Sequence, residues 1–375
     1  MNFASVDTRN SRIRGYLEQW YNLAQQSDYE VNEEQYGPSL DSLFSTPVWG
    51  FREVLLVVLV GMKLDNEYFS SRELYKCKPR AIYEGPIVSF LVEKRIPHRK
   101  SGPLNVAKAT QGLNVFWAAK RTPRSVADQV VFLVNYLESG NEEKNSKITN
   151  VAVSLMRRFI QETNRIENLV INITPSADPD FLYSICESLI VNAPDAGNTA
   201  QKICGYILSN YHSALQTGII VTGTEDRASV TSTTSKKPGD INEESLLGDI
   251  YKVYEITTKT FDNNRMHDSF DCISRYNASN GTSIHEICVI CRNEDCPAGM
   301  IKNSHYLYMG TYTYQNIIYR FVNIYEWIAG YLQNMIPQAR INFYNNLNAY
   351  ISDINTSEAV KQLWVRIHNN PDTLL

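Results

Sequence analysis

The sequence predicts a mixed α/β protein with a helical N-terminal region. Segments of the first half place apolar residues at helical spacing, which is typical of helices packed on a core. Residues 250–258 are rich in β-branched and aromatic side chains, and residues 284–291 form a short apolar run, as expected of strands. With 375 residues, 43% of them hydrophobic, the chain can form one large or two ordinary domains.

Helices dominate the predicted elements of the first half. The apolar periodicity places them at residues 12–26, 51–63, 125–137, 148–163 and 180–191. The longest apolar run, 54–62, is far shorter than the ~20 residues of a membrane span, so a buried helix is expected there and no membrane association. The polar segment 140–146 is a candidate boundary. We assign residues 1–165 to a mainly helical region and 166–375 to a region containing the sheet.

The second half alternates helices and strands. A helix is predicted at 202–215, a strand at 217–223 and an exposed loop at 226–237, followed by the strand 250–258. Met266, Phe270, Ile273 and Tyr276 form a helical stripe, and the buried strand 284–291 comes next. A further strand is expected at 306–314, and long helices at 314–335 and 337–351.

Two acidic residues are expected to lie opposite each other in a hairpin. A turn centred on Leu247 and Gly248 pairs Asp240 with Glu255, and directly opposed residues lie about 4.5–5.5 Å apart. At that distance two carboxylates can share one divalent cation. Because side chains alternate along a strand, Glu255, Thr257 and Lys259 should share a face.

Asp249 is the alternative first acid, since Leu247–Ile250 repeats the Gly-Asp-Ile of residues 239–241. If residues 250–258 form one continuous strand, Asp249 and Glu255 are about 20 Å apart. They could not then bind the same ion, so Asp240 is preferred. The other interpretation of the whole segment is an ordinary exposed hairpin with charged edges.

These residues resemble the PD-(D/E)XK nucleases, the superfamily of many type II restriction endonucleases. That family has a Pro-Asp, a spacer, and then an acid, one apolar residue and Lys. Pro238 and Asp240 match with one inserted Gly, and Glu255 follows after 14 residues. Thr257 stands where the family has Lys, and Lys259 lies about 6.6 Å further along the same face. The order strand, turn, strand, helix, strand is also that of the family core, a mixed sheet flanked by helices.

The resemblance implies a type II restriction endonuclease that hydrolyses double-stranded DNA with Mg²⁺. Asp240 and Glu255 would be the metal ligands, and Thr257 would contribute a hydrogen bond. Lys259 would orient the attacking water or offset the charge that grows in the transition state. Glu243 and Glu244 are candidate outer ligands or ligands of a second metal ion. A homodimer acting on a palindromic site is the expected assembly. The alternative is a DNA-binding protein with an inactive nuclease-like core.

A basic segment is the candidate DNA-recognition surface. The net charge is −4, so contacts with phosphates must come from a local patch. Residues 94–127 contain eight Lys or Arg and no acidic residue. A helix-like run follows the turn at Lys100–Pro103, and Gln111 and Asn114 could contact bases. The proposed contact residues are Arg95, Arg99, Lys100, Asn105, Lys108, Lys120 and Arg121. A solvated basic face is the alternative.

Seven cysteines and a polar first segment without an apolar leader predict a reducing, cytoplasmic location. His285, Cys288, Cys291 and Cys296 have a spacing similar to that of zinc sites, which would make the chain a zinc-stabilised interaction module. Successive side chains of a strand point to opposite faces, however, so a buried strand carrying thiols is preferred. Phosphate-binding and dinucleotide-binding glycine motifs are absent.

Overall fold

The computed structural model of the chain describes residues 5–139, 144–226 and 237–369. The chain divides into two units, Met1–Asn168 and Leu169–Leu375. The polar segment 140–146 therefore belongs to the first unit. Its residues 140–143 lie outside the described residues, and a helix begins at Lys144.

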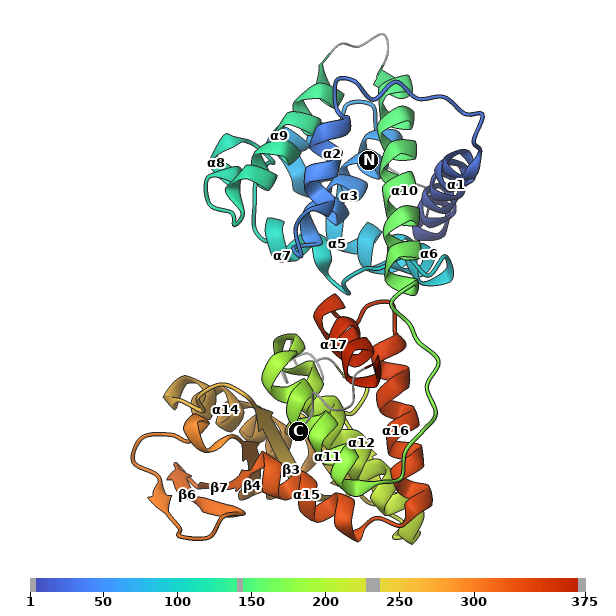
Figure 1. Cartoon of the computed structure of the whole chain (residues 1–375). Helices are drawn as coiled ribbons and strands as arrows, with labels where there is room; N and C mark the ends of the chain where they lie inside the picture. The colour runs from blue at the N-terminus through green and yellow to red at the C-terminus, as the bar shows by residue number, and fades with distance from the viewer. Residues whose placement is uncertain (1–4, 140–143, 227–236, 370–375) are drawn as a thin grey trace. The chain divides into compact units, whose positions relative to one another are not determined.

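The described part of the first unit is built from helices alone (Figure 1). They are α1 (Val6–Gln25), α2 (Gly37–Phe44), α3 (Gly50–Leu64), α4 (Ser70–Glu73), η1 (Leu74–Cys77), α5 (Pro79–Ile82), η2 (Tyr83–Ile87), α6 (Val88–Glu93), α7 (Gly102–Ala107), α8 (Val115–Ala118), α9 (Arg124–Glu138) and α10 (Lys144–Glu167).

Helix α3 is the centre of the first unit. Its apolar run from Val54 to Met62 is buried on every side, which explains why its hydrophobicity has no polar face. The core around it includes residues of α1, α9 and α10. Among the described residues, no helix has both the length and the apolarity needed to cross a membrane.

The second unit combines helices with one seven-stranded sheet. The helices are α11 (Pro179–Asn192), η3 (Asp195–Gly197), α12 (Asn198–Leu215), α14 (Asn263–Asn280), η4 (Asn293–Asp295), α15 (Ile324–Asn334), α16 (Pro337–Ser352) and α17 (Glu358–Asn369). The strands are β1 (Ile220–Thr222), β2 (Ile241–Glu244), β3 (Ile250–Thr257), β4 (Glu286–Cys291), β5 (Ile301–Lys302), β6 (Tyr308–Tyr314) and β7 (Ile317–Asn323). The predicted mixed α/β class is therefore confirmed.

The sheet is mixed, with strand order β1-β2-β3-β4-β7-β6-β5. Strands β1, β2 and β3 form an antiparallel meander, and β4 lies parallel to both β3 and β7. The crossover from β3 to β4 runs through α14, as a parallel connection requires. Strand, turn, strand, helix and strand thus follow one another in the predicted order from β2 to β4.

Alternate residues of β3 face two different helical layers. Tyr254 and Ile256 pack in a core with residues of α11, α12, α15 and α16. Val253 packs on the opposite face in a smaller core with Met266 and Ile273 of α14. Figure 1 shows α14 on one side of β3 and α11 and α12 on the other. Glu255 and Thr257 have the parity of Val253, so they face the α14 layer.

The predicted helix at 314–335 is wrong in its first half. Residues Ile317–Asn323 form β7, which pairs with β4 and β6 in the interior of the sheet. Its side chains alternate from Ile317 to Phe321, where Tyr319 and Phe321 are buried and Ile318 and Arg320 are exposed. Helix α15 begins only at Ile324, because the Asn323 side chain caps it by accepting from two backbone N–H groups.

Candidate active site

The β2–β3 hairpin brings Asp240 next to Glu255. Ile241 pairs with Tyr254 and Asn242 with Val253, which is the predicted register. Asp240 immediately precedes β2, and its Oδ2 accepts a hydrogen bond from the Ile256 backbone N–H at 2.9 Å. The carboxylate is therefore held against the end of β3, beside Glu255.

The alternative acid Asp249 lies at the other end of the hairpin. It is exposed in the turn, where its Oδ2 accepts a hydrogen bond from Ser245 Oγ at 3.1 Å. Glu243 lies on the opposite face of the sheet from Glu255, with Tyr254 donating to it at 2.8 Å and His212 Nε2 3.0 Å away. Glu244 accepts from Thr222 of β1. None of these three acids joins the Asp240–Glu255 pair.

Helix α14 covers the acid pair. Ser269 Oγ donates a hydrogen bond to Glu255 Oε1 at 3.3 Å. Burial raises the pKa of both carboxyl groups, and the Arg265 guanidinium, one turn earlier, opposes part of that rise by attracting the carboxylates. Tyr319 of β7 donates to the Met266 carbonyl at 3.3 Å and completes this side of the site. Four elements of the second unit thus converge on the pair.

Two half-buried carboxyl groups held next to each other cannot both ionise easily. Burial, followed by repulsion from Asp240, raises the pKa of Glu255 to about 8. Burial also raises the pKa of Asp240, while the Ile256 N–H and Arg265 oppose this rise. The metal-free pair therefore holds a proton near neutral pH, with one carboxyl hydrogen-bonded to the other.

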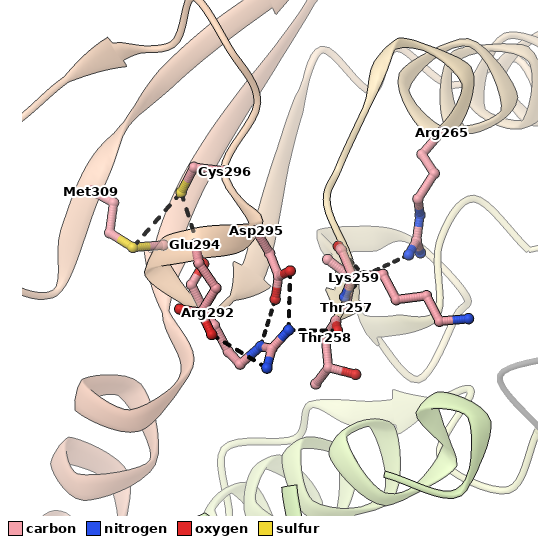
Figure 2. Close-up of polar contacts among 9 residues, drawn as sticks. All are labelled: Thr257, Thr258, Lys259, Arg265, Arg292, Glu294, Asp295, Cys296 and Met309. Carbon is pink, nitrogen blue, oxygen red and sulfur yellow. Dashed lines mark hydrogen bonds and ion pairs between the residues drawn. The ribbon is translucent and has the colours of Figure 1, made fainter. Parts of the chain in front are cut away.

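At the position where the family pattern has Lys, the structure has the buried hydroxyl of Thr257. The Thr257 Oγ1 accepts from the Arg265 guanidinium and from the Lys259 backbone N–H at 3.0 Å, and donates to the Lys259 carbonyl at 2.8 Å. Figure 2 shows that the Lys259 side chain extends away from this hydroxyl. It is exposed, so the structure places the predicted catalytic Lys outside the group formed by Asp240, Glu255 and Thr257.

Arg265 is the cation that sequence reasoning missed. It lies in the first turn of α14, where the Asp262 side chain caps the helix by accepting from the Arg265 N–H at 3.0 Å. A weak signal was present in the sequence. Arg265 and Ser269 are four residues apart and flank the apolar stripe of Met266 and Ile273, so they share one side of the helix that faces the sheet.

The donor set of the acid pair fits a hard divalent cation. Mg²⁺ prefers oxygen ligands, is often bound through one or two carboxylates and keeps several waters. Asp240 and Glu255 supply such oxygens, and their mutual repulsion favours a neutralising charge. In the part of the chain that the structure describes, no three His, Cys, Asp or Glu side chains form a metal-binding group. Any ion would therefore be completed by water or phosphate oxygens.

The basic segment of the first unit is less positive than its composition indicates. Lys94 pairs with Glu18 at 3.0 Å, Arg95 with Glu167 at 3.2 Å, and Arg124 contacts Asp128 at 3.6 Å. Acidic residues from other parts of the first unit thus offset three of its charges. Five of the proposed contact residues are exposed to solvent: Arg95, which is paired with Glu167, and Lys100, Asn105, Lys108 and Lys120.

Arg99 and Arg121 are partly engaged by the fold of the first unit. The Arg99 guanidinium lies over the Trp49 ring, 4.5 Å from its centroid, and the buried Glu53 accepts from the Arg99 N–H at 2.6 Å. Arg121 donates to Thr110 Oγ1 at 3.3 Å. Both side chains are half-buried.

The helix-like run predicted after Lys100 is instead two short helices, α7 and α8. Ala109 has a left-handed φ of 55°, and Gly112 packs against the backbone of Ser71, where a Cβ would lie 2.1 Å from the carbonyl oxygen. Asn114 is used as the cap of α8, accepting from the Phe116 and Trp117 N–H groups. Its carboxamide is therefore engaged by the fold.

The zinc-like spacing does not produce a zinc site. Cys288 faces the α12 layer, whereas Cys291 faces the α14 layer, because the two are an odd number of residues apart on β4. The His285 ring bonds to Ser283 at the start of the strand. Together with Cys296, these residues do not converge on one point.

The sequence matches no protein-family profile and no curated protein.

Proposed function

We propose that the chain is a Mg²⁺-dependent endodeoxyribonuclease of the type II restriction class, which hydrolyses double-stranded DNA at a specific sequence. The observation that carries the proposal is the Asp240–Glu255 pair with Arg265 beside it. Two carboxylates that repel each other and a cation anchored on Thr257 form the group of charges that phosphodiester hydrolysis requires.

Asp240 and Glu255 would hold the ion, and Mg²⁺ when bound polarises the phosphoryl oxygen and lowers the pKa of a coordinated water. Asp240 is oriented by the Ile256 N–H, and Glu255 by the Ser269 hydroxyl. Arg265 carries a permanent charge next to both acids, so it is suited to stabilise the negative charge that grows on the phosphoryl group during attack.

Thr257 acts on this group through Arg265. Its buried hydroxyl accepts from the guanidinium and is itself held by two hydrogen bonds to the Lys259 backbone. Arg265 thus takes the charge-stabilising role that the resemblance gives to Lys. In this arrangement Lys259 contributes its backbone, and its exposed ammonium is left for contact with DNA.

The basic segment of the first unit would contribute binding to DNA, mainly through phosphate contacts. Cleavage of both strands of a palindromic site would be performed by a homodimer. The second candidate function is a DNA-binding protein with an inactive nuclease-like core. It is favoured by Thr257 at the position of the family Lys and by the direction of the Lys259 side chain.

A plasmid-cleavage assay with and without Mg²⁺ separates the two functions. The wild-type protein is expected to produce discrete fragments only with Mg²⁺, and Asp240→Asn and Glu255→Ala are expected to abolish them. The matched control is Asp249→Asn, because Asp249 is the nearby acid that lies in the turn and outside the pair. Fragments that persist in both pair variants would remove this site from consideration. DNA binding without cleavage under any metal would support the inactive core.

A further inference from the structure

A cluster of three sulfur atoms lies at the C-terminal end of β4. Cys291 is the last residue of that strand and is fully buried, while Cys296 follows η4 and is only half-buried. The Asp295 N–H donates to the Arg292 carbonyl at 3.1 Å, which closes a turn between the two cysteines, and both pack in the core on the α14 side of the sheet. The interaction between the two thiols raises the pKa of Cys291 and lowers that of Cys296. Figure 2 shows Cys296 also directed at Met309, with the two sulfur atoms 3.9 Å apart.

The turn between the two cysteines is hydrogen-bonded to the segment that follows β3. Arg292 donates to the Thr258 carbonyl at 2.8 Å and pairs with Asp295 at 2.7 Å. The Asp295 carbonyl accepts from the Phe261 N–H at 2.8 Å. Figure 2 draws this chain of contacts from Cys296 to Thr258, next to the Thr257–Arg265 bond. The segment 258–261 is thus held by the residues that separate the two thiols.

Cys291 also touches the candidate site through the sheet. It pairs in parallel register with Thr257, so the thiol and the hydroxyl lie on neighbouring strands. Both face the α14 layer, as Glu255 does. Cys291 is therefore the neighbour, on the adjacent strand, of the residue that anchors Arg265.

We propose that Cys291 and Cys296 form a reversible intramolecular disulfide, a redox switch on the segment from Thr257 to Phe261. A peroxide is the oxidant. The Cys296 thiolate attacks one peroxide oxygen to give a sulfenic acid and hydroxide, and the Cys291 thiol then displaces the sulfenic oxygen as water. Two thiols and one peroxide give one disulfide and two waters. A dithiol reverses the step, and the reduced form is the one expected in the reducing cytoplasm predicted for the chain.

Cys296 is the cysteine best placed to begin this reaction. The other six are buried, and burial raises the pKa of several of them, including Cys186, Cys204 and Cys288. A lowered pKa with partial exposure is the environment of a reactive thiol, and a resolving thiol in contact with it completes the pair.

Closing the bond moves Cys296 from Met309 toward Cys291 and pulls the turn 292–295 with it. The hydrogen bonds from this turn to Thr258 and Phe261 are then weakened, and the Thr257 hydroxyl loses its fixed position. The disulfide and its effect on this segment stand on the contacts alone. The effect on cleavage rests in addition on the proposed function.

Mass spectrometry of the peroxide-treated full-length protein tests the bond. Trypsin cleaves after Arg292, so a disulfide joins the peptide that contains Cys291 to the peptide that contains Cys296. The linked pair is expected in the wild type and in Cys288→Ser, the matched control on the other sheet face. It should be absent in Cys291→Ser and in Cys296→Ser. A wild type in which Cys296 stays a thiol, or in which only Met309 gains oxygen, overturns the proposal.

Hydrogen exchange tests the switch without any cleavage assay. The amide of Phe261 is expected to exchange at least severalfold faster in the oxidised wild type than in the reduced form, and to return on reduction. Cys296→Ser should show no change with peroxide. Equal exchange rates in a fully disulfide-linked wild type would overturn the switch.

A DNA-cleavage assay on the reduced and the oxidised protein distinguishes a failure of the redox switch from a failure of the proposed nuclease function. If the reduced protein cuts DNA, oxidation is expected to lower the rate reversibly in the wild type and in Cys288→Ser, but not in Cys296→Ser. An oxidised wild type that cuts as fast as the reduced protein would overturn the effect on cleavage. A reduced protein that never cuts overturns the nuclease proposal, while the mass and exchange measurements still decide the redox pair.

Discussion

Asp240 and Glu255 place two carboxyl groups against each other at one end of the sheet, and the protein bears an electrostatic cost for this arrangement. The Ile256 N–H, Ser269 and Arg265 offset part of the repulsion. They do not remove it, because the pKa of Glu255 stays at about 8. Residual repulsion of this kind is found at functional sites more often than in purely structural ion pairs.

The stability of the metal-free protein should report this repulsion. Between pH 4.5 and about 8 the folded Glu255 holds a proton that the unfolded chain has lost, so raising the pH favours unfolding. Relative to Glu255→Gln, the wild-type free energy of unfolding should fall by up to about 1.4 kcal/mol per pH unit in this window. Urea denaturation in a metal chelator measures it. Asp249→Asn should follow the wild type, and parallel curves for wild type and Glu255→Gln would contradict the prediction.

Arg265 and Lys259 can be compared directly. Arg265→Ala is expected to lower the cleavage rate by about 10²–10³, the usual loss when one group that stabilises transition-state charge is removed. Lys259→Ala should stay within a few-fold of the wild type, because its side chain points away from Thr257. Arg265→Lys should recover part of the rate. Cleavage rates measured under saturating Mg²⁺ test this prediction. A larger loss of rate in Lys259→Ala than in Arg265→Ala would assign the catalytic role to Lys259.

At the level of elements, the hairpin between β2 and β3 sets the site. Its turn requires a left-handed residue, and Gly248 has a φ of 89°. The β2–β3 register continues to Asp240 without a shift, since the only irregularity lies at Glu243 and Glu244, near the turn. The position of the acid pair therefore depends on a local turn about seven residues away.

Gly248 and Gly330 form a matched pair for testing the turn. A Cβ added at either position would meet nothing within 4 Å, so packing does not distinguish them. Gly248→Ala should destabilise by roughly 1–2 kcal/mol because φ is left-handed. Gly330→Ala, inside α15, should instead stabilise by about 0.5–1 kcal/mol. Denaturant midpoints measure the stability of both variants. If both substitutions stabilise the protein, a side chain at position 248 does not strain the backbone of the turn.

At the level of the whole molecule, the distribution of charge means that any binding of DNA phosphates must come from a local basic surface. The chain is acidic overall, and its first unit offsets several residues of the basic segment with acids from distant parts of the sequence. The exposed lysines of that segment, Lys100, Lys108 and Lys120, are the remaining candidates for contacts with phosphates.

The salt dependence of DNA binding tests this assignment. In an Asp240→Asn background, which is expected to lack cleavage, replacing Lys100, Lys108 and Lys120 with Ala should weaken binding to DNA of any sequence. The slope of log affinity against log salt should fall by about 0.9 for each phosphate that the variant no longer neutralises. Lys94→Ala is the control, because Lys94 already pairs with Glu18 and Glu93. Fluorescence anisotropy measures the slopes, and an unchanged slope in the triple variant would place the DNA elsewhere.

The sequence alone determined what depends on local geometry. Alternation along β3 and a glycine turn specify which residues oppose each other, so the Asp240–Glu255 pair followed from counting residues. The sequence also carried a signal for β7 in the alternating side chains of Ile317–Asn323 and in the helix cap at Asn323. Aromatic residues at helical spacing in the same segment obscured that signal. Tertiary structure alone decided which cation reaches the acids, which thiols meet, and which basic residues are offset. These depend on contacts between elements far apart in the sequence, and local patterns carry no information about such distances.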